Sequence, residues 1–322
     1  MVWDLLLVAG GLALLLGGGE ALVRGASGLA LFAKISPAVI GLTVVAAGTS
    51  MPELVVSVQA ALAGSAGLAM GNVVGSNIFN IAAILGLTAL IRPLHIQGNT
   101  VRLEWPVMAV ATALLILLGW NTRLGRIEGS ILVVGLVFFV AYAVWLSRRN
   151  STEADRAAYG EIATASLGRR GGLGLLLNLL ALGLGIACLA GGSTLLVAGG
   201  VGLASALGIS ETVIGLTIVA AGTSSPELAT SLVAAWRGRD DMAVGNLVGS
   251  NIFNILGIAG FTALIHPLEV PREIIARDNW WMLGTTLLLF PLMLTGLRVN
   301  RAEGGLLVAV FACYMAVLLL GG

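Results

Sequence analysis

The sequence has little charge. Of its 322 residues only 10% are charged, and the 17 basic residues almost balance the 16 acidic ones. A soluble domain carries about 25% charged residues, so this scarcity excludes a water-soluble globular protein. The net charge of +1 also excludes nucleic acid as a partner, because no basic surface can be built from it.

Cysteine and histidine are nearly absent, with two residues of each. Cys188 and Cys313 lie in apolar stretches, which predicts buried thiols and not a disulfide. His95 and His266 fall between the apolar stretches. An intramembrane hydrolase with Ser50 or Ser224 as its nucleophile would therefore find no histidine base inside a span. We expect a protein that is not an enzyme and has no cofactor.

Apolar runs of about 20 residues recur along the whole chain, and each is long enough to cross a bilayer as a helix. They do not alternate in polarity as barrel strands do, so a bundle of transmembrane helices in the lipid bilayer is predicted. The 45 glycines indicate close helix packing. Asp4 stands where a signal peptide would be basic, so the first run is expected to be retained. The ten predicted spans are residues 2–33, 37–62, 68–91, 103–120, 128–147, 173–207, 211–236, 242–265, 280–297 and 304–321.

The two halves of the chain repeat one another. Residues 39–81 and 213–255 align without a gap, with 29 identities in 43 positions. Each half then holds five spans, an odd number, so the second half enters the membrane inverted. Such repeats place a substrate site at the midplane and support alternating access. We predict an all-α fold made of a first five-helix repeat (1–147), a linker (148–172) and a second repeat (173–322).

Basic residues in the loops predict the orientation. With the N-terminus outside, 13 of the 17 basic residues lie on the inner side and four on the outer side. Since inner loops are enriched in Lys and Arg, we expect a multi-pass plasma-membrane protein with both termini outside and a cytoplasmic linker.

A glutamate follows a proline in the second and seventh spans, in "GTSMPE" (48–53) and "GTSSPE" (222–227). Proline has no N–H and interrupts the helix, which makes carbonyl oxygens near Ala46 and Ala220 available to a ligand. Four-residue steps place the motif's polar side chains on one face, with Ser50 and Ser224 beside them. These side chains are Thr49, Glu53 and Ser57 in the first copy, and Thr223, Glu227 and Ser231 in the second.

A second repeated motif, "GSNIFN", supplies amides and hydroxyls in the spans that follow. Its stripes are Asn72, Ser76 and Asn80, and Asn246, Ser250 and Asn254. Oxygen ligands without cysteine or histidine suit hard cations such as Ca²⁺ or Na⁺. A glutamate inside a membrane is costly and marks a functional site, and two glutamates balance the charge of one Ca²⁺.

The paired motifs closely resemble the calcium/cation antiporter superfamily, and within it the prokaryotic sodium/calcium exchanger branch. The resemblance implies export of Ca²⁺ in exchange for Na⁺. The implied Ca²⁺ ligands are Glu53, Glu227, Thr49 and Thr223. The implied Na⁺ ligands are Ala46, Ser50, Glu53, Ser76, Asn80, Ala220, Ser224, Glu227, Ser250 and Asn254.

One position departs from the family pattern. Several relatives, and the potassium-dependent branch, have an aspartate where Asn254 stands, so the sequence argues against K⁺ co-transport. A proton-coupled exchanger of the same superfamily is the main alternative. A passive cation channel and an intramembrane hydrolase are remote ones.

Overall fold

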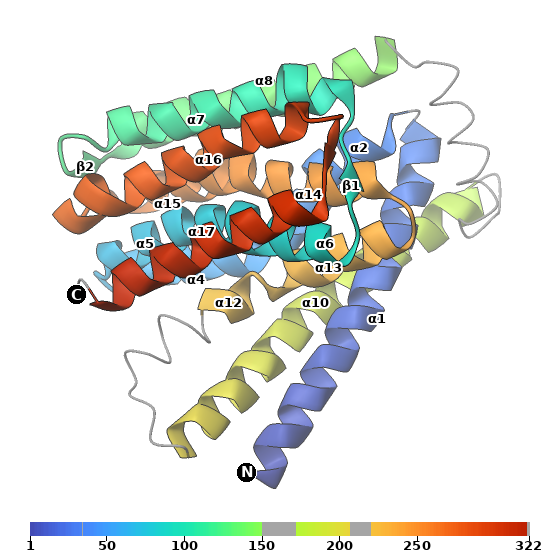
Figure 1. Ribbon diagram of the computed structural model, residues 1–322, viewed down its shortest axis with the longest axis horizontal. Helices are drawn as coiled ribbons and strands as arrows, with labels where there is room; N and C mark the ends of the chain where they lie inside the picture. The colour runs from blue at the N-terminus through green and yellow to red at the C-terminus, as the bar shows by residue number, and fades with distance from the viewer. Residues whose placement is uncertain (34, 150–171, 207–219, 321–322) are drawn as a thin grey trace. The chain divides into compact units, whose positions relative to one another are not determined.

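A computed structural model describes residues 1–33, 35–149, 172–206 and 220–320, which are almost entirely helical (Figure 1). Within this part of the chain, seven helices are long and apolar enough to cross a membrane. They are Val2–Ala30, Ala66–Ile91, Thr100–Leu118, Arg126–Ser147, Gly172–Leu203, Asp240–Ile265 and Arg301–Leu320. An eighth span is obtained if Gly41–Thr49 and Met51–Leu62, bent by 50° at their break, are counted together. The protein is therefore a helical multi-pass membrane protein.

Two of the ten predicted spans are not among these eight. The ninth is present as α16 (Asn279–Leu294), a helix of 16 residues that ends three residues before the predicted boundary. The seventh was predicted over residues 211–236, and its first part, to residue 219, lies outside the described residues, as do residues 150–171 of the predicted linker.

The chain forms two compact units. Unit 1 contains residues Met1–Thr49 and Tyr142–Asn246, and unit 2 contains Ser50–Ala141 and Leu247–Gly322. Each unit thus takes helices from both predicted sequence repeats. The division into repeats at residues 147 and 173 describes the symmetry of the sequence, and it stays a prediction.

Unit 1 is built on two long helices, α1 (Val2–Ala33) and α10 (Gly172–Ala206), which lie side by side (Figure 1). Glycines spaced by seven residues face the partner backbone. A Cβ atom on Gly11 would lie 2.8 Å from the carbonyl oxygen of Gly192, and one on Gly185 would lie 2.6 Å from the amide nitrogen of Leu22. No side chain fits at such distances, so glycine is required for this antiparallel seam.

The remaining elements of unit 1 are short helices. They are α2 (Pro37–Ile40), η1 (Gly41–Val45), α3 (Ala46–Thr49), α12 (Ala220–Thr223) and α13 (Ser225–Trp236). An ionic cluster ties α1 to the C-terminal end of α13, because Glu20 accepts hydrogen bonds from both Arg24 and Arg237. The Arg237 Nε lies 2.9 Å from the Glu20 Oε2.

Unit 2 contains the other elements of the chain. In its first part these are α4 (Met51–Leu62), α5 (Ala66–Ile78), η2 (Phe79–Leu85), α6 (Gly86–Ile91), β1 (Leu94–His95), η3 (Thr100–Glu104), α7 (Trp105–Leu118) and β2 (Arg123–Leu124). In its second part they are η5 (Phe253–Ala259), α15 (Gly260–Ile265), β3 (Leu268–Glu269), η6 (Ile274–Asp278), α16, β4 (Arg298–Val299) and α17 (Arg301–Leu320). The helices α8 (Arg126–Arg149) and α14 (Asp240–Ile252) run from one unit into the other.

Contacts inside unit 2 occur in repeat-related pairs. Strand β1 pairs with β4, with Leu94 opposite Val299, and β2 pairs with β3, with Leu124 opposite Leu268. The helix contacts follow the same rule: Gly86 meets Gly304, and Gly260 meets Gly129, each near the partner's carbonyl oxygen. Two sets of equivalent contacts therefore hold this unit together.

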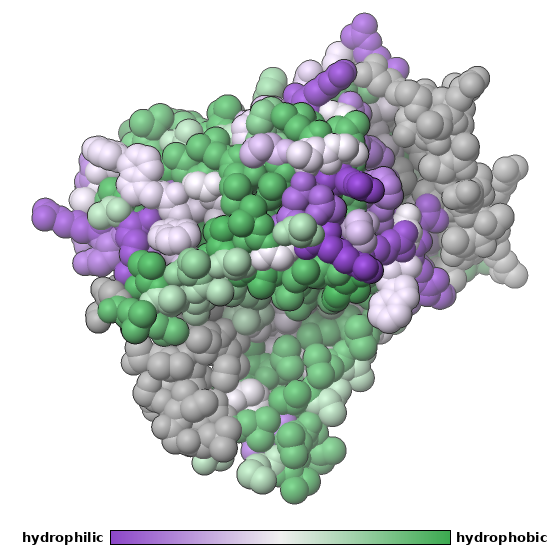
Figure 2. All heavy atoms as spheres, in the orientation of Figure 1, coloured by the Kyte–Doolittle hydropathy of each residue, from purple (hydrophilic) through white to green (hydrophobic). Residues whose placement is uncertain are grey.

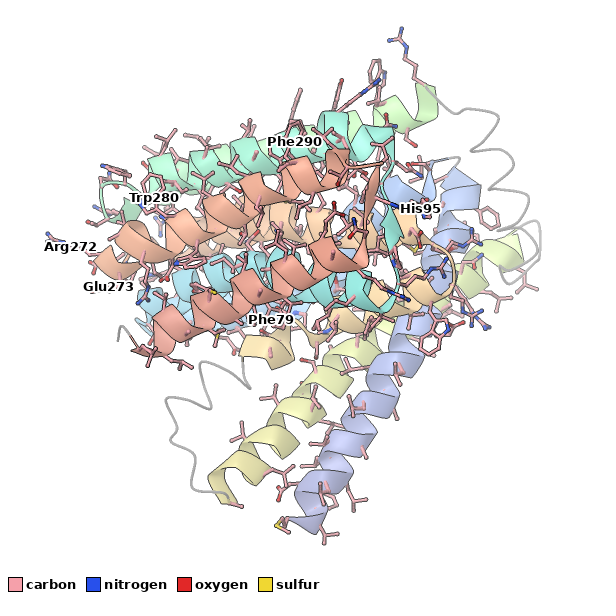
Figure 3. The ribbon with its side chains drawn as sticks, viewed as in Figure 1. Phe79, His95, Arg272, Glu273, Trp280 and Phe290 are labelled. Carbon is pink, nitrogen blue, oxygen red and sulfur yellow. The ribbon has the colours of Figure 1, made fainter. Side chains whose placement is uncertain are left out.

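The two strand pairs lie at opposite ends of the helices, as the positions of His95 and Arg272 illustrate (Figure 3). Hydrophilic residues gather at both ends of α16 and α17, and hydrophobic residues cover the middle (Figure 2). Such a surface suits a protein that sits across an apolar layer.

Candidate functional site

The predicted helix break is present in both copies of the motif, two residues earlier than the proline. Ser50 lies between α3 and α4 with φ −85° and ψ 8°, and Ser224 lies between α12 and α13 with φ −89° and ψ 8°. Each proline occupies the first turn of the following helix, where its missing N–H costs nothing. The interruption therefore falls before the proline.

In unit 2, Glu53 and Ser57 of α4 are buried and both are linked to Asn72 of α5. The Asn72 Nδ2 donates to the backbone oxygen of Glu53 at 3.1 Å and to the Ser57 Oγ at 2.8 Å. The Glu53 side chain is only 1% exposed. Asn72 thereby joins the predicted stripe of α5 to the helix that bears the carboxylate.

Unit 2 also contains the predicted residues Ser76, Asn80, Ser250 and Asn254, and it brings Ser76 and Asn254 into contact. Asn254 Nδ2 donates to Ser76 Oγ at 3.0 Å. Three buried oxygens among these residues, the Oδ1 atoms of Asn80 and Asn254 and the Oγ of Ser250, have no hydrogen-bond partner within the described part of the chain. Buried oxygens of this kind are costly unless something binds them, and a cation would satisfy them.

In unit 1, a hydrogen-bonded chain connects the two sequence copies. Thr49 Oγ1 lies 3.3 Å from Asn246 Oδ1, and Asn246 Nδ2 donates to Ser231 Oγ at 3.0 Å. Glu227 is fully buried at the first turn of α13. Thr223 and Ser224 are buried as well, and Ala220 is the first residue of α12.

The carbonyl oxygens at the breaks have different partners in the two copies. The Gly222 oxygen accepts hydrogen bonds from Ser193 Oγ at 2.5 Å and Ser225 Oγ at 2.6 Å. At the repeat-related positions around Gly48, these serines are replaced by Gly19 and Met51. The predicted ligand oxygen of Ala46 lies 3.2 Å from the Thr49 Oγ1, whose single hydrogen is shared between this oxygen and the Asn246 Oδ1.

The glutamate-bearing helices carry no basic residue. Neither Met51–Leu62 nor Ser225–Trp236 contains Lys or Arg. Helix dipoles favour the carboxylates, because each glutamate lies in the first turn of its helix. No cluster of three or more His, Cys, Asp or Glu side chains occurs in the described ranges. The buried polar groups near the breaks are carboxylate, amide and hydroxyl groups.

Four polar residues of these networks were not predicted: Asn77, Asn251, Ser193 and Ser225. Asn77 and Asn251 belong to the quoted "GSNIFN" motif. They were not predicted because the polar stripe was drawn only through residues four positions apart. Ser193 and Ser225 occur in only one copy, so the repeat did not point to them. Burial of a polar residue in an apolar span was the signal available for all four.

A family model described as "Sodium/calcium exchanger protein" matches residues 3–145 and 177–320, which is most of the chain. The chain belongs to the sodium/calcium exchanger family. This is a family of transporters and not of enzymes, and its members include antiporters. The membership supports cation antiport as the activity of this protein.

Similar proteins cover nearly the whole chain. The "Putative antiporter CaxA" of Alkalimonas amylolytica is 39% identical over 96% of both chains. The "Sodium/calcium exchanger MaX1" of Methanosarcina acetivorans is 30% identical over 96% of both. A structure of the sodium-calcium exchanger NCX_Mj, soaked with zero Na⁺ and Ca²⁺, superposes with a TM-score of 0.83 at 30% identity and covers 98% of this chain and 99% of that one.

Proposed function

We propose that this family member is a Na⁺/Ca²⁺ antiporter that exports Ca²⁺ by alternating access. The observation that carries the proposal is the pair of buried glutamates, Glu53 and Glu227, 1% and 0% exposed. Each lies in the first turn of a helix that follows a break and that has no basic residue. A membrane protein retains such carboxylates where a cation crosses.

The charge balance favours a divalent ion alternating with monovalent ones. Two carboxylates neutralise one Ca²⁺, which takes about six to eight oxygen ligands. We assign Ca²⁺ to Glu53 and Glu227, with the backbone oxygens of Thr49 and Thr223. We assign Na⁺ to the same glutamates together with Ala46, Ser50, Ser76, Asn80, Ala220, Ser224, Ser250 and Asn254.

The buried oxygens of unit 2 support this ligand set. Asn80, Asn254 and Ser250 each present an oxygen that makes no hydrogen bond to the described residues. Amide and hydroxyl oxygens are neutral ligands, which suit a site that must release its ion as well as bind it. The absence of an aspartate at position 254 argues against K⁺ as a further substrate.

For the architecture we propose ten spans in two inverted five-helix repeats. The contacts that occur twice in unit 2 support it, since β1–β4 and β2–β3 are related by the sequence repeat. Each strand pair also joins two loops that the ten-span topology assigns to the same side of the membrane. The broken helices at Ser50 and Ser224 then supply the interrupted spans from which transporter sites are built.

For the location we propose the plasma membrane, with both termini outside and residues 148–172 in the cytoplasm. The 13 to 4 distribution of basic residues supports this orientation. Under it, Na⁺ entering down its gradient drives Ca²⁺ outward.

Flux measurements in reconstituted vesicles test the proposal. Vesicles loaded with Na⁺ are diluted into Na⁺-free medium that contains radioactive Ca²⁺, beside vesicles with a K⁺ or a pH gradient. We expect rapid Ca²⁺ uptake with the Na⁺ gradient alone. Uptake driven only by the pH gradient would identify a proton-coupled exchanger, and uptake without any counter-ion would identify a channel.

A further inference from the structure

Six buried polar side chains of unit 2 occupy repeat-related positions, but their hydrogen bonds do not follow the sequence repeat. The first copy contributes Ser76, Asn77 and Asn80, and the second contributes Ser250, Asn251 and Asn254, none more than 6% exposed. Because the two triplets are identical in type and spacing, a symmetric arrangement would show each hydrogen bond twice. It does not.

The asymmetry lies in Asn77 and Asn251. Asn80 Nδ2 donates to Asn251 Oδ1 at 3.1 Å, and Asn251 Nδ2 donates to the backbone oxygen of Asn77 at 3.2 Å. The repeat-related chain would run from Asn254 through Asn77. Instead, Asn77 Nδ2 donates to Val73 of its own helix at 2.6 Å.

This network decides which way the Asn80 amide points. Asn251 uses its N–H on a backbone carbonyl, so it offers Asn80 an oxygen that can only accept. Asn80 must therefore turn its nitrogen to Asn251 and its Oδ1 away from it. That Oδ1 is one of the buried oxygens without a hydrogen bond in the part of the chain that the structure describes.

Ser76 orients Asn254 by the same chemistry. Its hydroxyl hydrogen is donated to the backbone oxygen of Asn72 at 2.6 Å, which leaves only lone pairs for Asn254. The nitrogen of Asn254 is therefore selected and its Oδ1 is turned outward. In both cases the donor group of Asn251 or Ser76 is used by a backbone carbonyl oxygen, so this residue can only accept a hydrogen bond from the amide of Asn80 or Asn254.

We propose that Asn251 is a positioning residue that holds Asn80 with its oxygen directed to the transported cation. This inference rests on the proposed function, because it gives the oriented Asn80 oxygen its role. Asn77, although identical in type, has no such role. The Asn77 Oδ1 is also buried without a hydrogen bond among the described residues, but its side chain orients no other amide, and only its backbone oxygen is used by Asn251.

A comparison of N251A with N77A in the full-length protein tests this asymmetry. Two measurements are made: the rise in melting temperature caused by NaCl or CaCl₂ in detergent, and the internal Na⁺ concentration that gives half-maximal Ca²⁺ uptake in vesicles. In N251A that Na⁺ concentration should rise about tenfold, the effect of losing one oriented Na⁺ ligand, and most of the Na⁺-induced stabilisation should disappear. N77A should stay within about twofold of the wild type, as expected for an amide that bonds only within its own helix.

Two further variants separate positioning from packing. If Asn251 acts through Asn80, then N80A and N80A/N251A should bind Na⁺ equally, whereas independent residues would have additive effects. N251D keeps an acceptor for Asn80 and should retain Na⁺ binding even if N251A is too unstable to purify.

The inference is wrong if N251A binds Na⁺ like the wild type, if N77A is impaired to the same extent, or if folded N251D does not bind Na⁺. A wild-type protein without any Ca²⁺- or Na⁺-dependent stabilisation, and without Na⁺-driven uptake, would instead refute the proposed function itself.

Discussion

The side-chain nitrogen of Asn72 lies 2.8 Å from the hydroxyl of Ser57 and donates to it. Asn246 makes the same bond to Ser231 at 3.0 Å, in the other unit. The Asn246 bond is buried and the Asn72 bond is partly buried, and each ties a glutamate-bearing helix to the helix that follows it. Two repeat-related positions thus keep the same local connection.

Removal of either hydroxyl should therefore weaken the fold. S57A and S231A should each lower the free energy of unfolding by about 0.5–1.5 kcal/mol, the net worth of one hydrogen bond, as measured by denaturation in detergent. Ser65 provides the control, because it is exposed and makes no side-chain capping bond. Equal stabilities of S57A and S65A would contradict this prediction.

The glutamates should be essential for transport and dispensable for folding. E53Q or E227Q should reduce Na⁺-driven Ca²⁺ uptake by about 100-fold or more, since removing one charge from a buried binding pair costs about 2–5 kcal/mol of binding free energy. Glu269 on β3 is exposed, so E269Q should transport normally. Ca²⁺ uptake by E53Q at the wild-type rate would remove Glu53 from the site.

The glycine seam of unit 1 makes a prediction about stability. G185A should destabilise the protein by about 1–3 kcal/mol, the usual cost of overpacking, because the added Cβ would lie 2.6 Å from the Leu22 nitrogen. Gly183 lies in the same helix with nothing within 4 Å of an added Cβ. G183A should leave the melting temperature unchanged or higher, and a fall as large as that of G185A would argue against close contact.

Exchange should carry net charge. With Asn80 and Asn254 neutral, the two glutamates balance one Ca²⁺, and three Na⁺ would leave one positive charge over. Each charge moved is worth about 2.3 kcal/mol per 100 mV, so an inside-positive potential should accelerate Ca²⁺ uptake into Na⁺-loaded vesicles. Uptake that ignores a valinomycin-clamped potential and follows a pH gradient would favour the proton-coupled alternative.

Orientation can be tested by cysteine labelling in intact cells. On a C188A/C313A background, a cysteine at Thr152 should be protected from an impermeant thiol reagent. One at Glu269, in the loop after α15, should be labelled. The reverse result would invert the topology and with it the direction of transport.

The bounds of some helices are predicted well by the extent of the apolar run. The first span was predicted over residues 2–33, and α1 has those bounds. The break was placed at Pro52, yet it lies at Ser50, because proline is tolerated in a first helical turn. A missing N–H shows that a helix is interrupted, but not which neighbouring residue leaves the helical conformation.

The π-helical turns and the hydrogen-bond partners could not be predicted. Apart from Asn80, the segment Phe79–Leu85 is apolar. Its composition does not show whether its backbone hydrogen bonds join residues five apart, as in a π-helix, or four apart, as in an α-helix. Asn80 lies in this turn, so a stripe drawn at four-residue steps identifies the residue but not its partner. That partner, Asn251, lies far away in the sequence and is recognised only once the helices are packed.

The repeated contacts of unit 2 have a consequence for how such a protein can diverge. Gly86 meets Gly304 and Gly260 meets Gly129, so each half presents one surface to the other and receives the same surface back. Two identical polypeptides would associate through an isologous interface of this kind, in which every substitution is made twice. In a single fused chain, one copy can change alone. Ser193 on the Gly222 carbonyl, with glycine at the matching position 19, is a difference that a homodimer encoded by one gene could not acquire.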